Sequence, residues 1–245
     1  MLSDDAGPGP ATRPAGPPGG LHSNLLDRLG ARIVAGALAA GHVLTLDGID
    51  REYAVSRSVS RESVRVLESM GLVASRRRVG VTVLPRDRWN VFDPRVIRWR
   101  LDGEDREQQL RSLSELRGGV EPAAAALAAV RATPDQCAAM TGAVMAMAEH
   151  GRSGDLEAYL AADREFHATL LAASGNEMLS ALSEVVGEVL SGRTHHNLMP
   201  SRPNPAAIRL HADVAGAVQS GDGPAAERTM RAIIDEATAA MLEGR

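Results

Sequence analysis

The chain has 245 residues, which is enough for two ordinary domains that each bury their own core. Hydrophobic residues make up 44% and charged residues 24%, near the averages for globular proteins, and no apolar run approaches the roughly 20 residues of a membrane span. The start of the chain lacks the pattern of a secretory signal, and the single cysteine, Cys137, excludes an internal disulfide. We therefore expect a cytoplasmic protein that does not bind membranes.

The charges are distributed unevenly along the chain. All 27 basic residues are arginine. Residues 21–100 carry 14 arginines against 8 acidic residues, whereas residues 101–245 carry 12 arginines against 21 acidic residues. A basic front half suits a polyanionic partner such as nucleic acid, and the acidic remainder suits a different task.

The first 85 residues divide into a tail and a compact unit. Residues 1–20 are rich in Pro and Gly with almost nothing apolar, so we expect a disordered tail. From residue 21 onward, apolar residues recur at helical spacing, which predicts helices over about 23–41 and 49–54.

A third helix of this unit lies in the stretch VSRSVSRESVRVLESMGLV. Ser58 or Ser60 can cap its start, and Gly71 can end it. Two β-prone runs, LVASRRR and VGVTVLP, follow and predict a β-hairpin with a basic turn. Residues 21–85 are therefore predicted to form a winged helix-turn-helix, with three helices and a hairpin.

Arginines mark this third helix and the hairpin. In a helix-turn-helix the second helix of the motif enters the major groove of duplex DNA, and arginines four residues apart share one helix face. The residues predicted to contact DNA are Arg57, Ser58, Ser60, Arg61, Arg65, Arg76, Arg77, Arg78 and Gly80. The alternative is a solvated helix face on which these arginines form salt bridges with nearby glutamates.

The remainder of the chain reads as helical. Residues 86–107 are predicted to be a linker, and residues 108–245 an all-helical domain rich in Ala and Leu. Pro and Gly punctuate this domain into predicted helices over about 108–130, 134–150, 155–173, 177–196, 205–219 and 223–243. The expected fold class is mostly α.

A family resemblance covers about residues 24–243. The stretch VSRSVSRESVRVLESMGLVASRRRVGVTV resembles the winged helix-turn-helix of the GntR superfamily of transcription regulators, and Arg57, Arg61 and Gly80 fall on matching positions. The helical half resembles the FCD branch of FadR-like regulators, in particular its sugar-acid-responsive, galactonate-repressor-like members. One departure is that Asp47-Gly48 stands where relatives carry an operator-contacting arginine.

The helical domain contains a candidate metal site. Asp163 and His167 lie four residues apart, so on a helix they share a face and can hold one divalent metal, or they form an ordinary surface pair. The resemblance implies His211 as a further ligand. It also implies a histidine 22 residues later, where this chain has Ile233.

The remaining coordination positions have several candidate occupants. Water, an oxygen-rich effector, or His195 or His196 could fill them, and the two histidines could instead form an exposed helix end. Imidazole with carboxylate suits zinc, nickel or iron, and manganese when histidines are few.

Two further residues are candidates for binding an effector. The resemblance places Arg117 near a ligand pocket, where it would capture a carboxylate, or it is an ordinary exposed arginine. Asn176 lies in an S-G-N stretch that the family shares, and it is either a ligand contact or a helix cap.

Together these features predict a homodimeric repressor, not an enzyme, that binds double-stranded operator DNA and is released by a small carboxylate such as a sugar acid. Two-fold dimers reading palindromic half-sites supply the base contacts that one small domain lacks. The alternatives are a metal-dependent enzyme of the helical domain and an architectural DNA binder without effector control.

Overall fold

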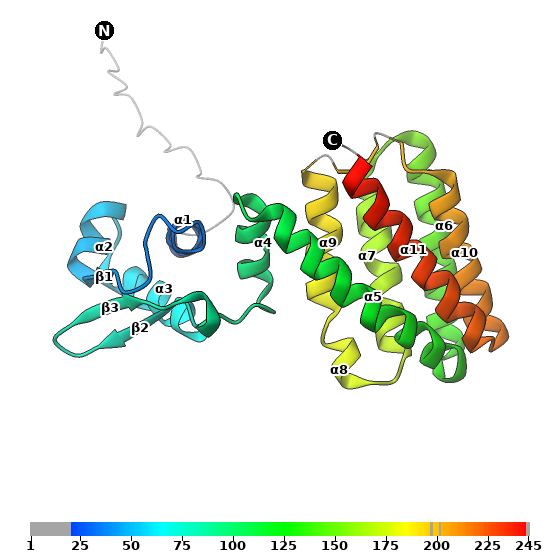
Figure 1. The fold of residues 1–245 in the computed structure, drawn as a ribbon, viewed down its shortest axis with the longest axis horizontal. Helices are drawn as coiled ribbons and strands as arrows, with labels where there is room; N and C mark the ends of the chain where they lie inside the picture. The colour runs from blue at the N-terminus through cyan, green and yellow to red at the C-terminus, as the bar shows by residue number, and fades with distance from the viewer. Residues whose placement is uncertain (1–20, 197, 201, 244–245) are drawn as a thin grey trace, which may run out of the picture.

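The computed structural model describes residues 21–196, 198–200 and 202–243. The predicted disordered tail, residues 1–20, lies outside the described residues. The chain forms two lobes, a small one with three helices and a sheet and a larger one made of helices, and helix α4 lies between them (Figure 1).

The small lobe is a winged helix-turn-helix, as predicted. Its elements are α1 (Leu21–Val34), β1 (Val43–Leu44), α2 (Leu46–Tyr53), α3 (Arg57–Ser69), β2 (Val73–Arg76) and β3 (Gly80–Val83). The strands form an antiparallel sheet in the order β1-β3-β2, with Leu44 opposite Val81 and Arg76 opposite Gly80. Strand β1 was not predicted.

Helix α3 begins earlier than predicted. Ser56 is its N-cap, and its side chain accepts a hydrogen bond from the Val59 backbone N–H. Satisfying this free N–H at the first turn is what fixes a helix start. The predicted caps, Ser58 and Ser60, consequently lie inside the helix.

The segment predicted as a linker contains structure of its own. It holds a short 3-10 helix, η1 (Arg86–Arg88), and α4 (Pro94–Asp102). Asp93 caps α4 by accepting from the backbone N–H groups of Arg95 and Val96, and Pro94 occupies the first turn, where its missing N–H costs nothing.

Helix α4 contributes side chains to both lobes. Val96 and Trp99 belong to the hydrophobic core of the small lobe, where Trp99 lies so close to α1 that a Cβ at Gly30 would come within 2.3 Å of its ring. Ile97 and Leu101 belong to a cluster formed with the large lobe. The two faces of this one helix therefore join the lobes.

The large lobe is a bundle of helices punctuated much as predicted. Its helices are α5 (Arg106–Arg131), α6 (Pro134–Ser153), α7 (Leu156–Ala173), α8 (Glu177–Ser180), α9 (Ser183–His195), α10 (Pro205–Ser220) and α11 (Gly223–Glu243). A capping box of Thr133 and Gln136 starts α6, and glycines at 154 and 221 adopt the left-handed conformation that ends α6 and α10.

One predicted helix is divided in two. The stretch predicted as a single helix over 177–196 breaks at Ala181-Leu182 into α8 and α9. Among the described residues, no helix is both long and apolar enough to span a bilayer.

Candidate functional site

Helix α3 presents arginines to solvent on one face. Arg57, Arg61 and Arg65 are exposed, whereas Val64 and Leu67 on the opposite side are buried in the core of the small lobe. This is the division that a recognition helix requires, because one side must pack while the other faces the groove.

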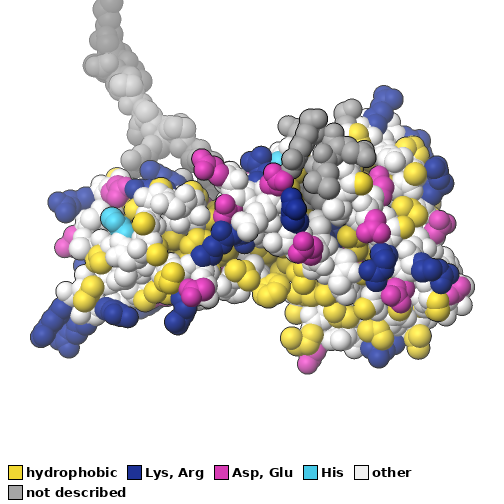
Figure 2. All heavy atoms as spheres, viewed as in Figure 1, with side chains coloured by type: hydrophobic (Ala, Val, Ile, Leu, Met, Phe, Trp, Pro, Cys, Tyr) yellow, Lys and Arg dark blue, Asp and Glu magenta, His cyan; other side chains and the backbone are white. Residues whose placement is uncertain are grey.

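The hairpin between β2 and β3 carries a second group of arginines. Arg76, Arg77 and Arg78 are exposed, and Figure 2 shows basic side chains gathered at the tip of the small lobe. Arg78 adopts φ of 67° in the turn, which is unusual for a residue other than glycine. The turn thereby projects its arginines away from the sheet.

Two of the predicted DNA contacts have structural roles instead. Ser60 is fully buried within the small lobe, so its side chain does not reach the surface. Gly80 has φ of 119°, and a Cβ there would lie 2.6 Å from the Leu44 carbonyl oxygen. Gly80 therefore allows β1 to pair closely with β3.

Arg57 is held by two carboxylates of α2. It forms ion pairs with Asp47 and, at 3.1 Å, with Asp50. The Ser60 hydroxyl, and next Arg57, hold the pKa of Asp50 below its usual value. Asp47 and Asp50 therefore neutralise the first arginine of α3.

In the large lobe, α7 and α10 bring Asp163, His167 and His211 together. All three are buried, and their candidate ligand atoms lie within 4.8 Å of one another. Asp163 Oδ1 is 3.4 Å from His167 Nε2 and 3.3 Å from His211 Nε2. Atoms that ligate one ion at bond lengths of about 2.1 Å lie about 3.0–3.4 Å apart, so these separations fit a shared metal.

The contacts of the outer nitrogens direct the inner nitrogens of both imidazoles toward Asp163, and His167 Nε2 also lies 3.4 Å from Arg117 Nη2. His211 Nδ1 lies 2.7 Å from the Ala207 carbonyl, which can only accept, so Nδ1 carries a proton. His211 Nε2 and Asp163 Oδ1 then have no hydrogen-bond partner among the described residues. A lone pair facing a buried carboxylate oxygen is stable only when a proton or a metal ion lies between them.

Glu121 of α5 orients His167 from behind. Its Oε2 lies 2.5 Å from His167 Nδ1, so His167 donates there and directs Nε2 toward Asp163. A carboxylate behind a metal-binding imidazole is a common supporting contact that fixes the ring. Phe166 packs edge-on against the rings of His167 and His211 and holds them in place.

Arg117 and Glu121 form a fully buried ion pair. Arg117 Nε lies 2.5 Å from Glu121 Oε1. Burial acts to raise the pKa of Glu121, but the charge of Arg117, followed by that of His167, outweighs it and holds the pKa at about 2. For Asp163, burial is likewise outweighed by the close contacts with His167 and His211, which hold its pKa well below the usual range. Both carboxylates are therefore ionised.

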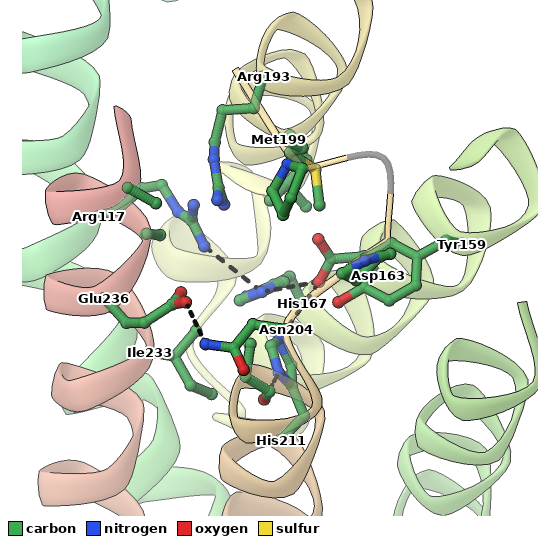
Figure 3. Close-up of a pocket in the computed structure, with 16 residues that line it drawn as sticks. Arg117, Tyr159, Asp163, His167, Arg193, Met199, Asn204, His211, Ile233 and Glu236 are labelled. Carbon is green, nitrogen blue, oxygen red and sulfur yellow. Dashed lines mark hydrogen bonds and ion pairs between the residues drawn. The ribbon is translucent and has the colours of Figure 1, made fainter. Parts of the chain in front are cut away.

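A cavity of about 220 Å³ opens beside the three candidate ligands (Figure 3). Arg117 lines it as predicted, but its charge is already balanced by Glu121. Ile233 of α11 forms an apolar part of the wall at the position of the missing histidine. The remaining polar lining comes from Tyr159, Arg193, Asn204 and Glu236.

Three predicted site residues lie elsewhere. His195 Nε2 is 3.3 Å from Glu157, and His196 Nε2 is 3.2 Å from Asp102, in a different pocket. The structure therefore does not bring either histidine to the three ligands. The Asn176 side chain accepts from the Met178 backbone N–H at the start of α8, so it acts as a helix cap.

Two residues of the candidate site, Glu121 and Arg193, were not predicted from the sequence. Glu121 lies four residues after Arg117, a spacing that could have flagged an ion pair, but nothing in the sequence connects it with His167, 46 residues away. Arg193 of α9 lies in a stretch without a motif. Only the packing of α5, α7 and α9 brings these residues to one cavity.

Comparisons with known proteins agree with this architecture. Residues 21–83 match the bacterial regulatory proteins of the gntR family, and residues 112–236 match the FCD domain. The chain is 31% identical over 217 residues to the galactonate operon transcriptional repressor of Escherichia coli K12, covering 88% of this chain and 94% of the relative. It is 27% identical to the HTH-type transcriptional regulator YieP of the same organism, covering 86% and 90%.

A solved structure shares the fold. It is the structure of Lar, which controls expression of the agr system of Listeria monocytogenes, with a TM-score of 0.57, 18% identity and coverage of 91% of this chain and 97% of that one. The matched families and named relatives are transcription regulators rather than enzymes, which removes support for the enzyme alternative. The chain belongs to the GntR family of bacterial transcription regulators and combines its DNA-binding domain with an FCD domain.

Proposed function

We propose that this protein is a cytoplasmic, homodimeric repressor that holds a divalent metal in its FCD domain and leaves its operator when a small carboxylate, such as a sugar acid, binds beside the metal. The observation that carries this proposal is the cluster of Asp163, His167 and His211 in the wall of a cavity. The E. coli relative named as a repressor of a galactonate operon supports the sign of control and the class of effector.

The DNA-binding part of the proposal rests on the exposed arginines of α3 and the hairpin. The guanidinium group matches the two major-groove acceptors of guanine and also binds phosphate, which suits Arg61 and Arg65 on α3 and Arg76 to Arg78 on the wing. A homodimer would place two such surfaces on the two halves of a palindromic operator.

The metal part rests on the fit of the three ligands. Asp163, His167 and His211 would hold the ion, and Glu121 would keep His167 in the tautomer that ligates. A bound divalent ion supplies concentrated positive charge next to the cavity, which suits an anionic ligand. Zinc, nickel, iron and manganese are all compatible with one carboxylate and two imidazoles.

Release of DNA would follow from linkage between the two sites. A ligand shifts an equilibrium only through its differential affinity for the two states, and a reversal from 1:99 to 99:1 requires about 5.5 kcal/mol. The effector is therefore expected to bind the DNA-free protein far more tightly than the DNA-bound protein.

The DNA-binding role is tested by selecting duplexes from a random library with the full-length protein and measuring binding by fluorescence anisotropy. We expect an enriched palindrome, bound by a dimer in analytical ultracentrifugation. Arg61→Ala should weaken binding to it by about 1–3 kcal/mol. Equal binding of the parent and Arg61→Ala at every salt concentration would show that α3 is not the recognition helix.

The metal role is tested by elemental analysis after the protein has been incubated with zinc, nickel or manganese and desalted. His211→Ala should lose most of the bound metal, whereas His195→Ala, which removes a histidine outside the cavity, should retain it. Equal metal content in all three proteins would remove the proposed site. A protein that binds one palindrome but responds to neither metal nor organic acids would instead be an architectural binder.

A further inference from the structure

We propose that Arg193, rather than Arg117, receives the carboxylate of the effector, and that the effector is a small monocarboxylate bearing several hydroxyl groups. This inference rests on the proposed function of the same cavity and names the chemistry of its ligand. The inference rests on the contrast between Arg117 and Arg193, two buried arginines that line this cavity.

Arg193 is a buried cation without a partner. It is 8% exposed, it lines the cavity, and its Nε has no hydrogen-bond partner among the described residues. No carboxylate of the described residues lies within ion-pair distance of it, and Figure 3 shows its side chain extending from α9 into the cavity. Burial, reinforced by the charge of Arg117, lowers the pKa of Arg193.

Arg117 is in the opposite situation. Glu121 pairs with it through two contacts, Nε to Oε1 at 2.5 Å and Nη2 to Oε2 at 3.4 Å. Its remaining contact is with His167 Nε2 at 3.4 Å. Its charge is therefore balanced by Glu121, and its Nε and Nη2 contact the residues on the metal-binding side of the cavity.

Burying an unpaired charge lowers the stability of the folded protein, and nothing offsets that loss when no ligand is bound. A group kept in this state typically marks a functional site, where a ligand supplies the missing counter-charge. An anionic ligand in the cavity would face Arg193 on one side and the metal held by Asp163, His167 and His211 on the other. A carboxylate can satisfy both at once because it has two oxygens.

The rest of the lining specifies hydroxyl groups. Glu236 of α11 and Asn204 at the start of α10 lie at the cavity wall and contact one another at 3.5 Å, and the phenol of Tyr159 faces the same space. A carboxylate such as that of Glu236 accepts hydrogen bonds, so it suits a hydroxyl and repels a second carboxylate. A cavity of about 220 Å³ lies below the roughly 300 Å³ at which pockets for drug-sized ligands begin, so the ligand is small.

The experiment titrates the zinc-loaded full-length protein by calorimetry with four hydroxylated monocarboxylates: glycerate, threonate, gluconate and galactonate. Each is compared with its reduced polyol, with the unsubstituted alkanoate of equal length and with the dicarboxylate of equal length. We expect at least one hydroxylated monocarboxylate to bind, and its three counterparts to bind at least about tenfold more weakly.

Variants then separate Arg193 from the general site. Arg193→Gln should lower the affinity for that acid by about 100-fold or more, because the carboxylate loses a charged partner in a desolvated site. Arg193→Lys, which keeps the charge but not the planar donor pair, should retain part of the affinity. Arg209→Gln, which removes an exposed arginine of α10, should bind like the parent.

A folding readout distinguishes a ligand contact from a structural role. Without ligand, Arg193→Gln should melt at the same temperature as the parent or higher and keep its metal, because the substitution removes an uncompensated buried charge. A lower melting temperature without ligand would mean that Arg193 has a structural role, and would overturn the inference even if binding fell.

The outcomes for the inference and for the proposed function are distinct. If the parent binds none of the four acids, the carboxylate effector is wrong and this inference fails with it. If the parent binds one and Arg193→Gln binds it equally well, the proposed function stands and Arg193 is not the receptor. If the alkanoate binds as tightly as the hydroxylated acid, the requirement for hydroxyl groups is wrong.

Discussion

Asp47 is a single residue that changes the charge of the DNA-facing surface. Its side chain is 77% exposed and pairs with Arg57 at the start of the recognition helix. To contact a phosphate, Arg57 must first break its ion pairs with Asp47 and Asp50. The free energy needed to break them reduces the net contribution of Arg57 to DNA affinity.

Asp47→Arg is therefore expected to strengthen operator binding and to steepen its salt dependence. Each added phosphate contact makes the slope of log K against log salt steeper by about 0.9. Anisotropy titrations over a range of salt concentrations measure both quantities. Asp135→Arg is the control, because it makes the same charge change on exposed α6. Identical behaviour of the two variants would show that Asp47 does not face DNA.

Glu121 is a single residue on which the metal side of the cavity depends. It is fully buried and contacts both Arg117 and His167. Removing one partner of a buried ion pair leaves the other charge without compensation, which typically costs about 3–5 kcal/mol. The pair therefore adds little net stability, but replacing either residue alone would leave the other as an unpaired buried charge.

Glu121→Gln should accordingly lower the free energy of unfolding by about 3 kcal/mol or more, measured by urea denaturation. Glu115→Gln, an exposed change on the same helix, should stay within about 0.5 kcal/mol of the parent. A loss for Glu121→Gln as small as that of the control would mean that the ion pair is not formed in solution.

Among the helices, α9 connects the cavity with the DNA-binding lobe. It carries Arg193 into the cavity, and one turn and a half earlier it carries Glu188 to Arg98 of α4. Arg98 reaches Glu188 through two contacts of 3.0 and 2.5 Å. Gly192 lets α4 approach so closely that a Cβ there would lie 2.7 Å from Leu101. If ligand binding shifts α9, we therefore expect the shift to reach α4 through these contacts.

Arg98→Ala should weaken the coupling between effector binding and operator binding without lowering the affinity for the effector. We expect the effector to bind as before, while its effect on operator affinity falls, because the bidentate contact that ties α9 to α4 is gone. Calorimetry measures the first quantity and anisotropy with and without effector the second. Arg111→Ala removes an exposed pair on α5 and should leave both unchanged. Full effector response in Arg98→Ala would place the coupling elsewhere.

The fold was predictable where helix-ending residues or a clear apolar stripe mark an element in the sequence. Thr133-Pro134, the glycines at 154 and 221 and the apolar stripe of α3 gave helices close to those observed. Helix α4 was missed because its nine residues bury two faces in different lobes, so no single apolar stripe marks it. Strand β1 has two residues, too few for any alternating pattern.

The site was predictable only in part, for a different reason. Asp163 and His167 share a helix face by local spacing, and His211 followed from the family resemblance. Arg193 and Glu121 become part of the cavity through the packing of three helices, which no local spacing records. His195 and His196, at the end of α9, instead lie beside Glu157 and Asp102 and line a different pocket.

At the scale of the whole molecule, the two lobes differ in charge. The segment that forms the small lobe and α4 carries an excess of arginine, and the remainder an excess of acidic residues. In Figure 2 basic side chains gather at the wing, while basic and acidic side chains are interspersed over the large lobe. Such an asymmetric field orients the protein as it approaches a polyanion, with the wing leading and the FCD domain held away.

Sharing α4 between two cores also has a consequence for heat denaturation. If the small lobe melted alone, it would pull Val96 and Trp99 out of one core while Ile97 and Leu101 stayed anchored in the other, and a nine-residue helix cannot remain half formed. We expect differential scanning calorimetry of the full-length protein to show one endotherm, rather than the two resolved peaks that independent lobes would give. DNA binding and effector binding would then be lost together, over the same narrow range of temperature.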